Sequence, residues 1–239
     1  MATCKHCGKP LILSCGKCIY CGASEKCSQE YSIQQVNNDT TVHAVDLGLP
    51  SGTKWATCNL GAKNPWEYGG YYAWGETHTK SRYCWDNYKF YGGENGMTKY
   101  CNIAPRIDIA IDNLKELQPI DDAAASNWGT DWCIPTYDHL CELLDNTKNE
   151  WQLRNGVYGR LFISNNGNSL FFPAAGLHSD RFEDSHSGSG FYWCSSLYAG
   201  RLSLYNTDDA LCCVFNANRI YINEWHRPYG LSIRPILVL

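Results

Sequence analysis

Two cysteine pairs near the start of the chain have the spacing of metal ligands. Each belongs to a Cys-x-x-Cys-Gly segment, and ten residues separate Cys7 from Cys18. Two cysteines three apart in a tight turn direct both thiolates at one ion, and the glycine that follows leaves the backbone free to turn. Two such turns complete the tetrahedron that Zn²⁺ prefers. The sequence therefore predicts a structural zinc site with four ligands: Cys4, Cys7, Cys18 and Cys21.

Neighbouring residues leave this ligand set open by one member. Cys15 stands three residues before Cys18 and is an alternative to Cys18 or Cys21, while Cys27 and His6 are weaker alternatives. Free or disulfide-bonded thiols are the competing interpretation, and the paired spacing argues against it. A closed four-thiolate site has no open position for chemistry, so we expect the metal to stabilise a small module that docks to a partner.

The cysteine module ends where the composition changes. Six of the fourteen cysteines lie between Cys4 and Cys27, and the other eight are scattered over the rest of the chain. The stretch SQEYSIQQVNNDTT that follows is polar and has no apolar period, as in a linker. We therefore predict three parts, of which the first resembles a zinc ribbon: residues 1–28, a linker at 29–42, and one larger domain at 43–239.

The charge balance argues against one functional class. The 239 residues are 44% hydrophobic and carry a net charge of −4, which argues against a globally basic nucleic-acid-binding protein. Residues 1–28 contain four Lys and one Glu, a balance of +3 that permits weak nucleic-acid contact through the ribbon without requiring it.

Hydropathy gives an expectation for localisation. No apolar run approaches the roughly 18 residues that span a bilayer, and the first residues, MATCKHCGKP, lack the apolar stretch of a signal peptide. We therefore expect no membrane span and, by default, a cytoplasmic protein whose cysteines are thiols or metal ligands. Action on a virion, or at a surface reached without a signal peptide, stays open.

The larger domain reads as strands with two helices. Short apolar runs such as RLFIS and SLFFPAAG alternate with Asn/Gly turns. Asp121-Asp122 precedes an Ala run that stops at Trp128-Gly129, which predicts a short helix. Thr136 is a candidate N-cap for a second helix that ends near Asn146, with three leucines on one face. The fold class is therefore α+β with a mostly antiparallel sheet.

A series of phrases over residues 45–236 carries a family resemblance. They are VDLGLPSGTKWATCNLGA, YGGYYAWGET, WGTDWCIPTYDHLCELL, LFFPAAG, FYWCSS and YGLSIRPI. Together they resemble the C-type-lectin-like domains of Bacteroidetes and Fibrobacter paralogous families. The Ala-rich helix, the Trp and the Pro-Thr pair that opens the second helix resemble the formylglycine-generating-enzyme superfamily. The resemblance implies a C-type lectin fold of the formylglycine-generating-enzyme-like kind, preceded by the small zinc ribbon.

The closing segment adds a narrower resemblance. YWCSSL, a later FN and a final YGLSIRP are similar to the variable region of C-type-lectin-fold variable proteins of diversity-generating retroelements. That resemblance implies a variable region at about residues 194–229 and a surface diversified to bind protein or cell-surface targets. Such mutagenesis randomises adenines, mostly in Asn codons, and does not produce Lys, Gln, Glu, Met or Trp.

Composition supports this interpretation. These five residue types number 30 in residues 1–148, so thirty residues at that rate should contain about six. Residues 194–223 contain none. Strand-rich segments avoid Lys, Gln and Glu in any case, which is the competing explanation.

The same segment has the composition of a protein-binding surface. Tyr provides a large contact area at low entropy cost, small polar residues provide adaptable hydrogen bonds, and Arg anchors. The predicted ligand-binding residues are Tyr198, Arg201, Tyr205, Asp208, Asp209, Leu211, Asn218, Arg219, Tyr221, Asn223 and His226. The neighbouring aromatic residues are predicted to be framework: Phe191, Tyr192, Trp193, Phe215 and Trp225.

Two alternatives to a diversified binding protein stay open. One is a lectin-like paralogue that binds a fixed partner. The other is a copper oxidase of the formylglycine-generating type, which uses a pair of copper-binding cysteines near the C-terminus. YGLSIRPI replaces that family's closing Gly-Phe-Arg-Cys, so only Cys194, Cys212 or Cys213 stand near the required place. We therefore predict no catalytic residues and no enzymatic activity.

Overall fold

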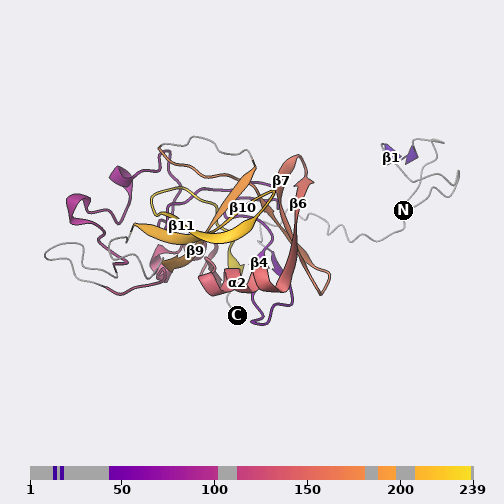
Figure 1. Ribbon diagram of the computed structural model, residues 1–239, viewed down its shortest axis with the longest axis horizontal. Helices are drawn as coiled ribbons and strands as arrows, with labels where there is room; N and C mark the ends of the chain where they lie inside the picture. Colours follow the sequence, from indigo (N-terminus) through magenta and orange to yellow (C-terminus); the bar gives the residue numbers. More distant parts are fainter. Residues whose placement is uncertain are drawn as a thin grey trace. The chain divides into compact units, whose positions relative to one another are not determined.

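The chain divides into two units, Met1–Thr40 and Thr41–Leu239. The computed structural model (Figure 1) describes residues 13–14, 17–18, 43–101, 112–180, 188–197 and 208–237. In the first unit, β1 (Leu13–Ser14) pairs antiparallel with β2 (Lys17–Cys18). This two-stranded pairing places Cys18 opposite Leu13. The other predicted zinc ligands, Cys4, Cys7 and Cys21, lie outside the described residues.

The described residues of the second unit form three antiparallel sheets. The first brings the beginning and the end of the unit together in the order β3-β4-β12-β5. Its strands are β3 (Ala44–Asp46), β4 (Lys54–Ala56), β5 (Trp132–Cys133) and β12 (Ile236–Leu237). Because β12 lies between β4 and β5, Ile236 and Leu237 pair with a strand on each side.

The other two sheets are three-stranded, and their long strands dominate the unit (Figure 1). One has the order β6-β7-β8, and the other has the order β11-β10-β9. The strands of the first are β6 (Thr147–Arg154), β7 (Val157–Ser164) and β8 (Ser169–Pro173). The strands of the second are β9 (Ser189–Leu197), β10 (Asp209–Asn216) and β11 (Ile220–His226).

Both predicted helices are confirmed, with the predicted caps. Helix α1 (Ala123–Trp128) begins after Asp122, whose side chain accepts hydrogen bonds from two backbone amides, and Gly129 follows its last residue. Helix α2 (Tyr137–Asn146) begins after Thr136, and the Thr136 amide donates to His139 Nδ1 at 3.1 Å. The part of the chain that the structure describes also has three short 3₁₀ segments: η1 (Trp85–Asn87), η2 (Gly93–Asn95) and η3 (Pro119–Asp121).

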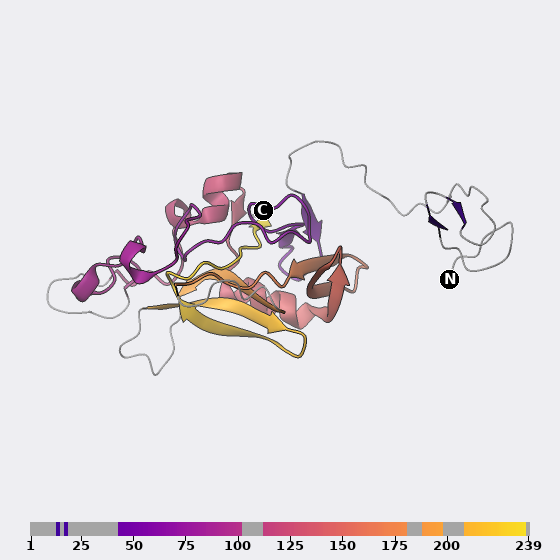
Figure 2. The ribbon, with the colours of Figure 1, turned by 90° about the horizontal axis from the view of Figure 1, so that it is seen from above.

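Two clusters of buried side chains form the core. One gathers aromatic residues of the long loops, such as Trp74 and Tyr100, around Trp193 of β9. The other joins the leucines of α2 to the opposite face of β9 and β10, including Tyr192 and Phe215. The β9-β10-β11 sheet is therefore packed on both faces (Figure 2). α2 supports one of these faces, because it packs against β9 and β10.

A buried arginine connects the closing segment to the rest of the core. Arg234 is 1% exposed, and its guanidinium donates to the Asn59 side chain at 2.9 Å and to the carbonyl of Phe171 at 2.8 Å. Further bonds reach the carbonyl of Ala56, the last residue of β4, and the carbonyl of Thr57. An uncompensated buried charge would be costly, so these bonds tie the YGLSIRPI segment to two sheets.

Over the residues that the structure describes, the fold is mixed and sheet-rich, with 38% strand and 14% helix, in line with the α+β expectation. All pairings between the named strands are antiparallel, as predicted. Within the described ranges, no helix is long and apolar enough to cross a membrane.

Candidate functional site

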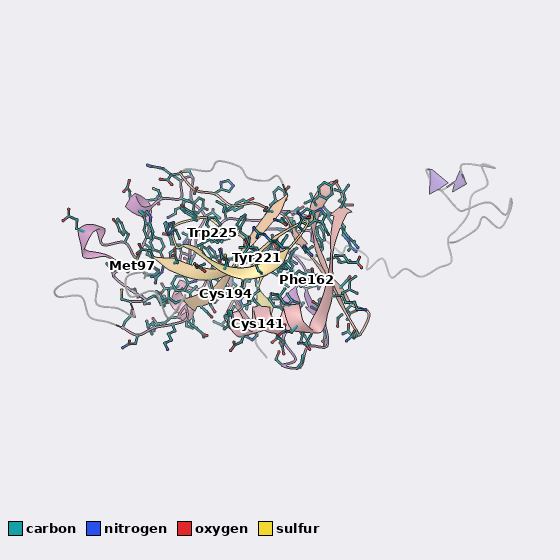
Figure 3. All side chains as sticks on the ribbon, in the orientation of Figure 1. Met97, Cys141, Phe162, Cys194, Tyr221 and Trp225 are labelled. Atoms are coloured by element: carbon teal, nitrogen blue, oxygen red, sulfur yellow. The ribbon has the colours of Figure 1, made fainter. Side chains whose placement is uncertain are left out.

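The predicted binding residues that the structure describes belong to the hairpin of β10 and β11. Seven aligned pairs join the two strands, from Asp209 opposite His226 to Phe215 opposite Ile220. The structure describes eight of the eleven predicted residues, and the other three, Tyr198, Arg201 and Tyr205, lie outside it. Figure 3 shows Tyr221 and Trp225 along β11.

One group of predicted residues meets at the turn of the hairpin. The side chain of Asn216 accepts hydrogen bonds from the amides of Asn218 and Arg219, at 2.9 and 3.1 Å, and this closes the turn. The Arg219 guanidinium lies 4.9 Å from the centre of the Tyr221 ring, within the range of a cation–π contact. Asn218 and Arg219 are exposed and Tyr221 is half-buried, so this end presents a cation, amides and an aromatic ring.

A second group meets at the other end of β11. His226 Nδ1 lies 2.7 Å from Asp209 Oδ1, and His226 is exposed whereas Asp209 is 7% exposed. Burial and the neighbouring Asp209 carboxylate raise the pKa of Asp208. The carbonyl of Asp208 accepts a hydrogen bond from the Arg227 amide at 2.9 Å. This end of the hairpin is acidic. Asp209 is itself buried and contacts the exposed His226.

The middle of the hairpin divides the remaining predicted residues between two faces. Side chains alternate along a strand, so Tyr221, Asn223 and Trp225 lie on one face. Tyr221 and Trp225 pack against the cluster that contains Trp193. Leu211 packs against the opposite cluster, the one that α2 covers. The structure therefore does not bring Leu211 together with Tyr221 and Asn223.

The predicted framework residues lie behind this hairpin. Phe191, Tyr192, Trp193 and Phe215 are between 0% and 9% exposed, which confirms their predicted place in the core. Trp225 is half-buried and meets the Phe191 ring at 5.3 Å between ring centres. A packed framework under a half-buried strand is what a binding surface needs to keep its geometry.

The three cysteines nearest to the hairpin are buried. Cys194, Cys212 and Cys213 are each at most 1% exposed. Burial raises the pKa of Cys194 and Cys213 to about 12, and burial also raises that of Cys212. All three are therefore protonated thiols at neutral pH, which makes them poor nucleophiles.

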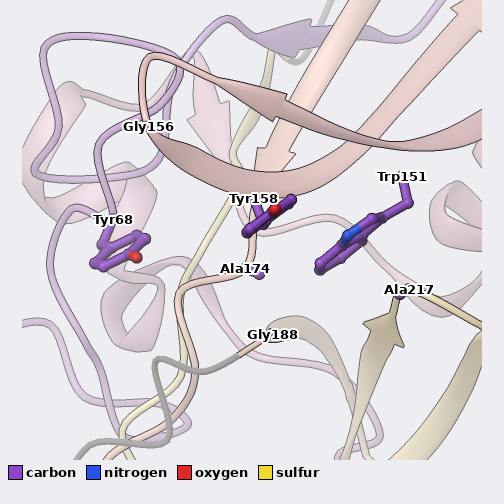
Figure 4. A pocket seen from close by; sticks show the side chains of 7 residues that line it. All are labelled: Tyr68, Trp151, Gly156, Tyr158, Ala174, Gly188 and Ala217. Carbon is purple, nitrogen blue, oxygen red and sulfur yellow. The ribbon is translucent and has the colours of Figure 1, made fainter.

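Sequence reasoning missed an aromatic pocket beside the hairpin turn. It has a volume of about 460 Å³. The Trp151 and Tyr158 rings are stacked at 5.8 Å and 7°, and Tyr68 lies across from them (Figure 4). The residues that line it are Tyr68, Trp151, Gly156, Tyr158, Ala174, Gly188 and Ala217. Ala217 directly precedes Asn218, so the pocket extends the candidate face at its hairpin end.

The part of this pocket that β6 and β7 form could have been predicted from the turn that joins these two strands. Asn155-Gly156 is a strong hairpin signal, and both residues have positive φ angles, 49° and 81°. The turn sets Leu153 opposite Tyr158, and both are more than half exposed. Tyr68 comes from a distant loop, and no periodicity in the sequence connects it to β6 and β7.

Comparisons with protein-family models, with curated proteins and with solved structures found no match to this chain.

Proposed function

We propose that this chain is a ligand-binding protein of the C-type lectin fold, in which residues 194–229, which include the β10–β11 hairpin, provide a diversified binding surface. The observation that carries the proposal is the arrangement of the hairpin. Exposed and half-exposed polar and aromatic residues run from Asn218 to His226, and a buried aromatic framework lies behind them. Binding to a protein or cell-surface target is the function that this arrangement serves best.

The length of the surface supports a macromolecular ligand. The exposed ends Arg219 and His226 are seven positions apart in the sequence, and a strand rises roughly 3.3 Å per residue, so the ends are about 23 Å apart. One end is cationic and the other is acidic. A small molecule cannot engage both ends, whereas a standard protein interface spans such a distance.

The buried cysteines support a binding function over an oxidase. A copper oxidase of the formylglycine-generating type needs thiols that reach a metal and a substrate. Burial and a raised pKa make Cys194, Cys212 and Cys213 packing residues. We therefore propose that the second unit has no enzymatic activity.

The first unit is proposed to be a zinc ribbon that tethers or docks the binding unit to a partner. Four thiolates in two Cys-x-x-Cys turns match the donor set of a structural zinc site. In the described part of this unit, the antiparallel β1–β2 pairing sets Cys18 opposite Leu13. The zinc supplies folding energy to this unit and takes no part in ligand recognition.

Two matched display libraries test the binding proposal. One randomises the surface positions Asn218, Arg219, Tyr221 and Asn223, and the other randomises Phe191, Trp193 and Phe215 of the framework. Both are selected against lysozyme as a defined protein probe. The surface library is expected to give folded binders with an unchanged melting temperature, and the framework library is expected to give neither.

The opposite result would contradict the proposal. If the surface library loses its cooperative melting transition, these residues belong to the core. If it stays folded and yields no binder while an unrelated binding scaffold does, the hairpin does not act as a binding surface.

A further inference from the structure

The aromatic pocket beside the hairpin turn has walls from separate parts of the fold (Figure 4). Trp151 of β6 and Tyr158 of β7 stand side by side with nearly parallel rings, and Tyr68 lies across from them. Ala217 borders the pocket at the β10–β11 turn. The three aromatic residues lie outside residues 194–229, so a site formed by their rings does not depend on the proposed diversified surface.

Hydrogen bonds hold the backbone around the pocket in place. The carbonyl of Tyr68 accepts a hydrogen bond from the side chain of Asn59 at 2.9 Å, and Asn59 is fully buried. Arg160, which is 7% exposed, donates to the carbonyl of Ala217 at 3.3 Å and to that of the preceding residue at 2.7 Å. The pocket is therefore formed before a ligand arrives, which lowers the entropic cost of binding.

The groups that line the pocket indicate the chemistry of its ligand. None of the described lining residues is charged, so a charged ligand would lose water there without gaining a counter-ion. Trp151 is half-buried and Tyr158 is 53% exposed. The Trp151 indole N–H and the Tyr158 hydroxyl make no hydrogen bond to any residue that the structure describes. The pocket therefore offers aromatic ring faces and two unused donors to an uncharged ligand.

Proline-rich segments have the matching chemistry. Proline has a compact apolar ring and no backbone N–H, and a polyproline II helix leaves its carbonyls free to accept hydrogen bonds. Such segments dock in aromatic-lined grooves at a low entropic cost, because the helix is preformed. A saccharide also stacks on aromatic rings, but its hydroxyls donate as well as accept. Among the described lining residues, no carboxylate or amide side chain is present to accept from them.

We infer that the pocket binds an uncharged, proline-rich segment of a partner protein. A pyrrolidine ring of the segment packs against the exposed ring of Tyr158, on the side of Tyr68. The Trp151 indole and the Tyr158 hydroxyl donate to carbonyls of the segment. The volume of about 460 Å³ lies within the range of roughly 300–1,000 Å³ that is usual for ligand-binding pockets.

Fluorescence anisotropy of fluorescein-labelled decaproline, titrated with the full chain, tests the site. The wild-type chain is expected to bind this peptide saturably and to leave a labelled Gly-Ser peptide of equal length unbound. Tyr158→Ala removes the exposed ring and should weaken binding by about tenfold. Leu153→Ala is the matched control and should bind as the wild type does. Leu153 lies opposite Tyr158 and is 55% exposed, but it does not line the pocket.

Two further variants separate the donor and the neighbouring surface from the pocket itself. Trp151→Phe keeps an aromatic ring and removes the indole N–H, so it should weaken binding by about fivefold. Arg219→Ala combined with Tyr221→Ala changes the candidate surface and should leave decaproline binding unchanged. The melting temperature verifies that each variant folds.

Several outcomes would overturn the inference. One is a wild-type chain that does not bind decaproline at concentrations up to about 1 mM. Another is binding that Tyr158→Ala leaves intact, or that the double surface variant abolishes. Saturable binding of maltose without binding of decaproline would assign the pocket to a saccharide instead. Failure of the surface library, together with pocket-dependent decaproline binding, would remove the proposed function alone and support this site.

Discussion

At the scale of single residues, burial determines which cysteine thiols can react. Cys194, Cys212 and Cys213 stand where an oxidase interpretation would need reactive thiols, yet they are at most 1% exposed. Burial raises the pKa of each thiol, so the thiolate is scarce at neutral pH. All three lie on strands β9 and β10, where cysteine packs as a small apolar residue.

Alkylation measures this directly. Brief treatment of the native protein with iodoacetamide at neutral pH, followed by peptide mapping, is expected to leave these three thiols unmodified. Cys141 on α2 is half-exposed and should be modified first among the described cysteines. Denaturant should make all four reactive. Rapid labelling of Cys212 or Cys213 in the native protein would return the oxidase alternative to consideration.

Asp121 is a buried carboxylate whose ionisation is tied to stability. Burial opposes its ionisation, but hydrogen bonds from Lys89, Lys99 and Tyr100 outweigh burial and hold its pKa below the usual value. The two lysine nitrogens lie 2.6 and 2.5 Å from its oxygens. A depressed pKa means that the native state favours the ionised form, so protonation weakens folding.

The sign of the pH dependence follows from this direction. The stability that Asp121 contributes is complete above its unfolded pKa of about 3.9 and is lost as the pH falls below that value toward the native pKa. Asp121→Asn is expected to lower stability near neutral pH and to flatten its decline below about pH 4. Urea unfolding over a pH series measures both effects. A decline as steep in the variant as in the wild type would show that other carboxylates dominate acid unfolding.

At the scale of elements, local signals predicted what local interactions determine. α1 and α2 were predictable because a capping side chain and the helix that it caps are neighbours in sequence. The partition of the hairpin was not predictable, because the burial of Asp209 depends on its register opposite His226. The aromatic pocket was not predictable either, since Tyr68 reaches it from a separate loop.

The capping box of α2 gives a prediction at this scale. Thr136→Ala removes the hydroxyl that accepts from the His139 amide at 3.3 Å, and it should cost about 1 kcal/mol of unfolding free energy. Thr136→Ser keeps the hydroxyl and should cost less. Chemical denaturation of both variants decides the matter. Equal losses in the two variants would assign the effect to the lost methyl group instead of the cap.

At the scale of the whole molecule, the chain combines a small cysteine-rich unit with a large sheet-rich one. The proposed roles separate in the same way, with metal-dependent folding in the first and ligand binding in the second. Because four thiolates bind zinc far more tightly than scattered cysteines do, the metal content should depend on the first unit alone.

Metal analysis of the full chain tests this separation. We expect one zinc per chain in the wild type and none in a variant with Cys4→Ser and Cys7→Ser. Cys141→Ser is the matched control and should keep the zinc. Loss of zinc should leave the melting transition of the second unit unchanged. Zinc that survives the double substitution would place the site among other ligands, and copper or iron in its place would contradict the zinc ribbon.

The central claim is that the exposed positions of residues 194–229, which include the β10–β11 hairpin, are diversified while the framework of the hairpin is fixed. Deep sequencing of the coding segment for residues 190–229, in a population of the cells that carry the gene, tests this most directly. Substitutions are expected to concentrate at exposed positions such as Asn218 and Arg219 and at the half-exposed Tyr221, and to spare Trp193 and Phe215. An invariant segment, or substitutions spread evenly over surface and framework, would contradict the claim.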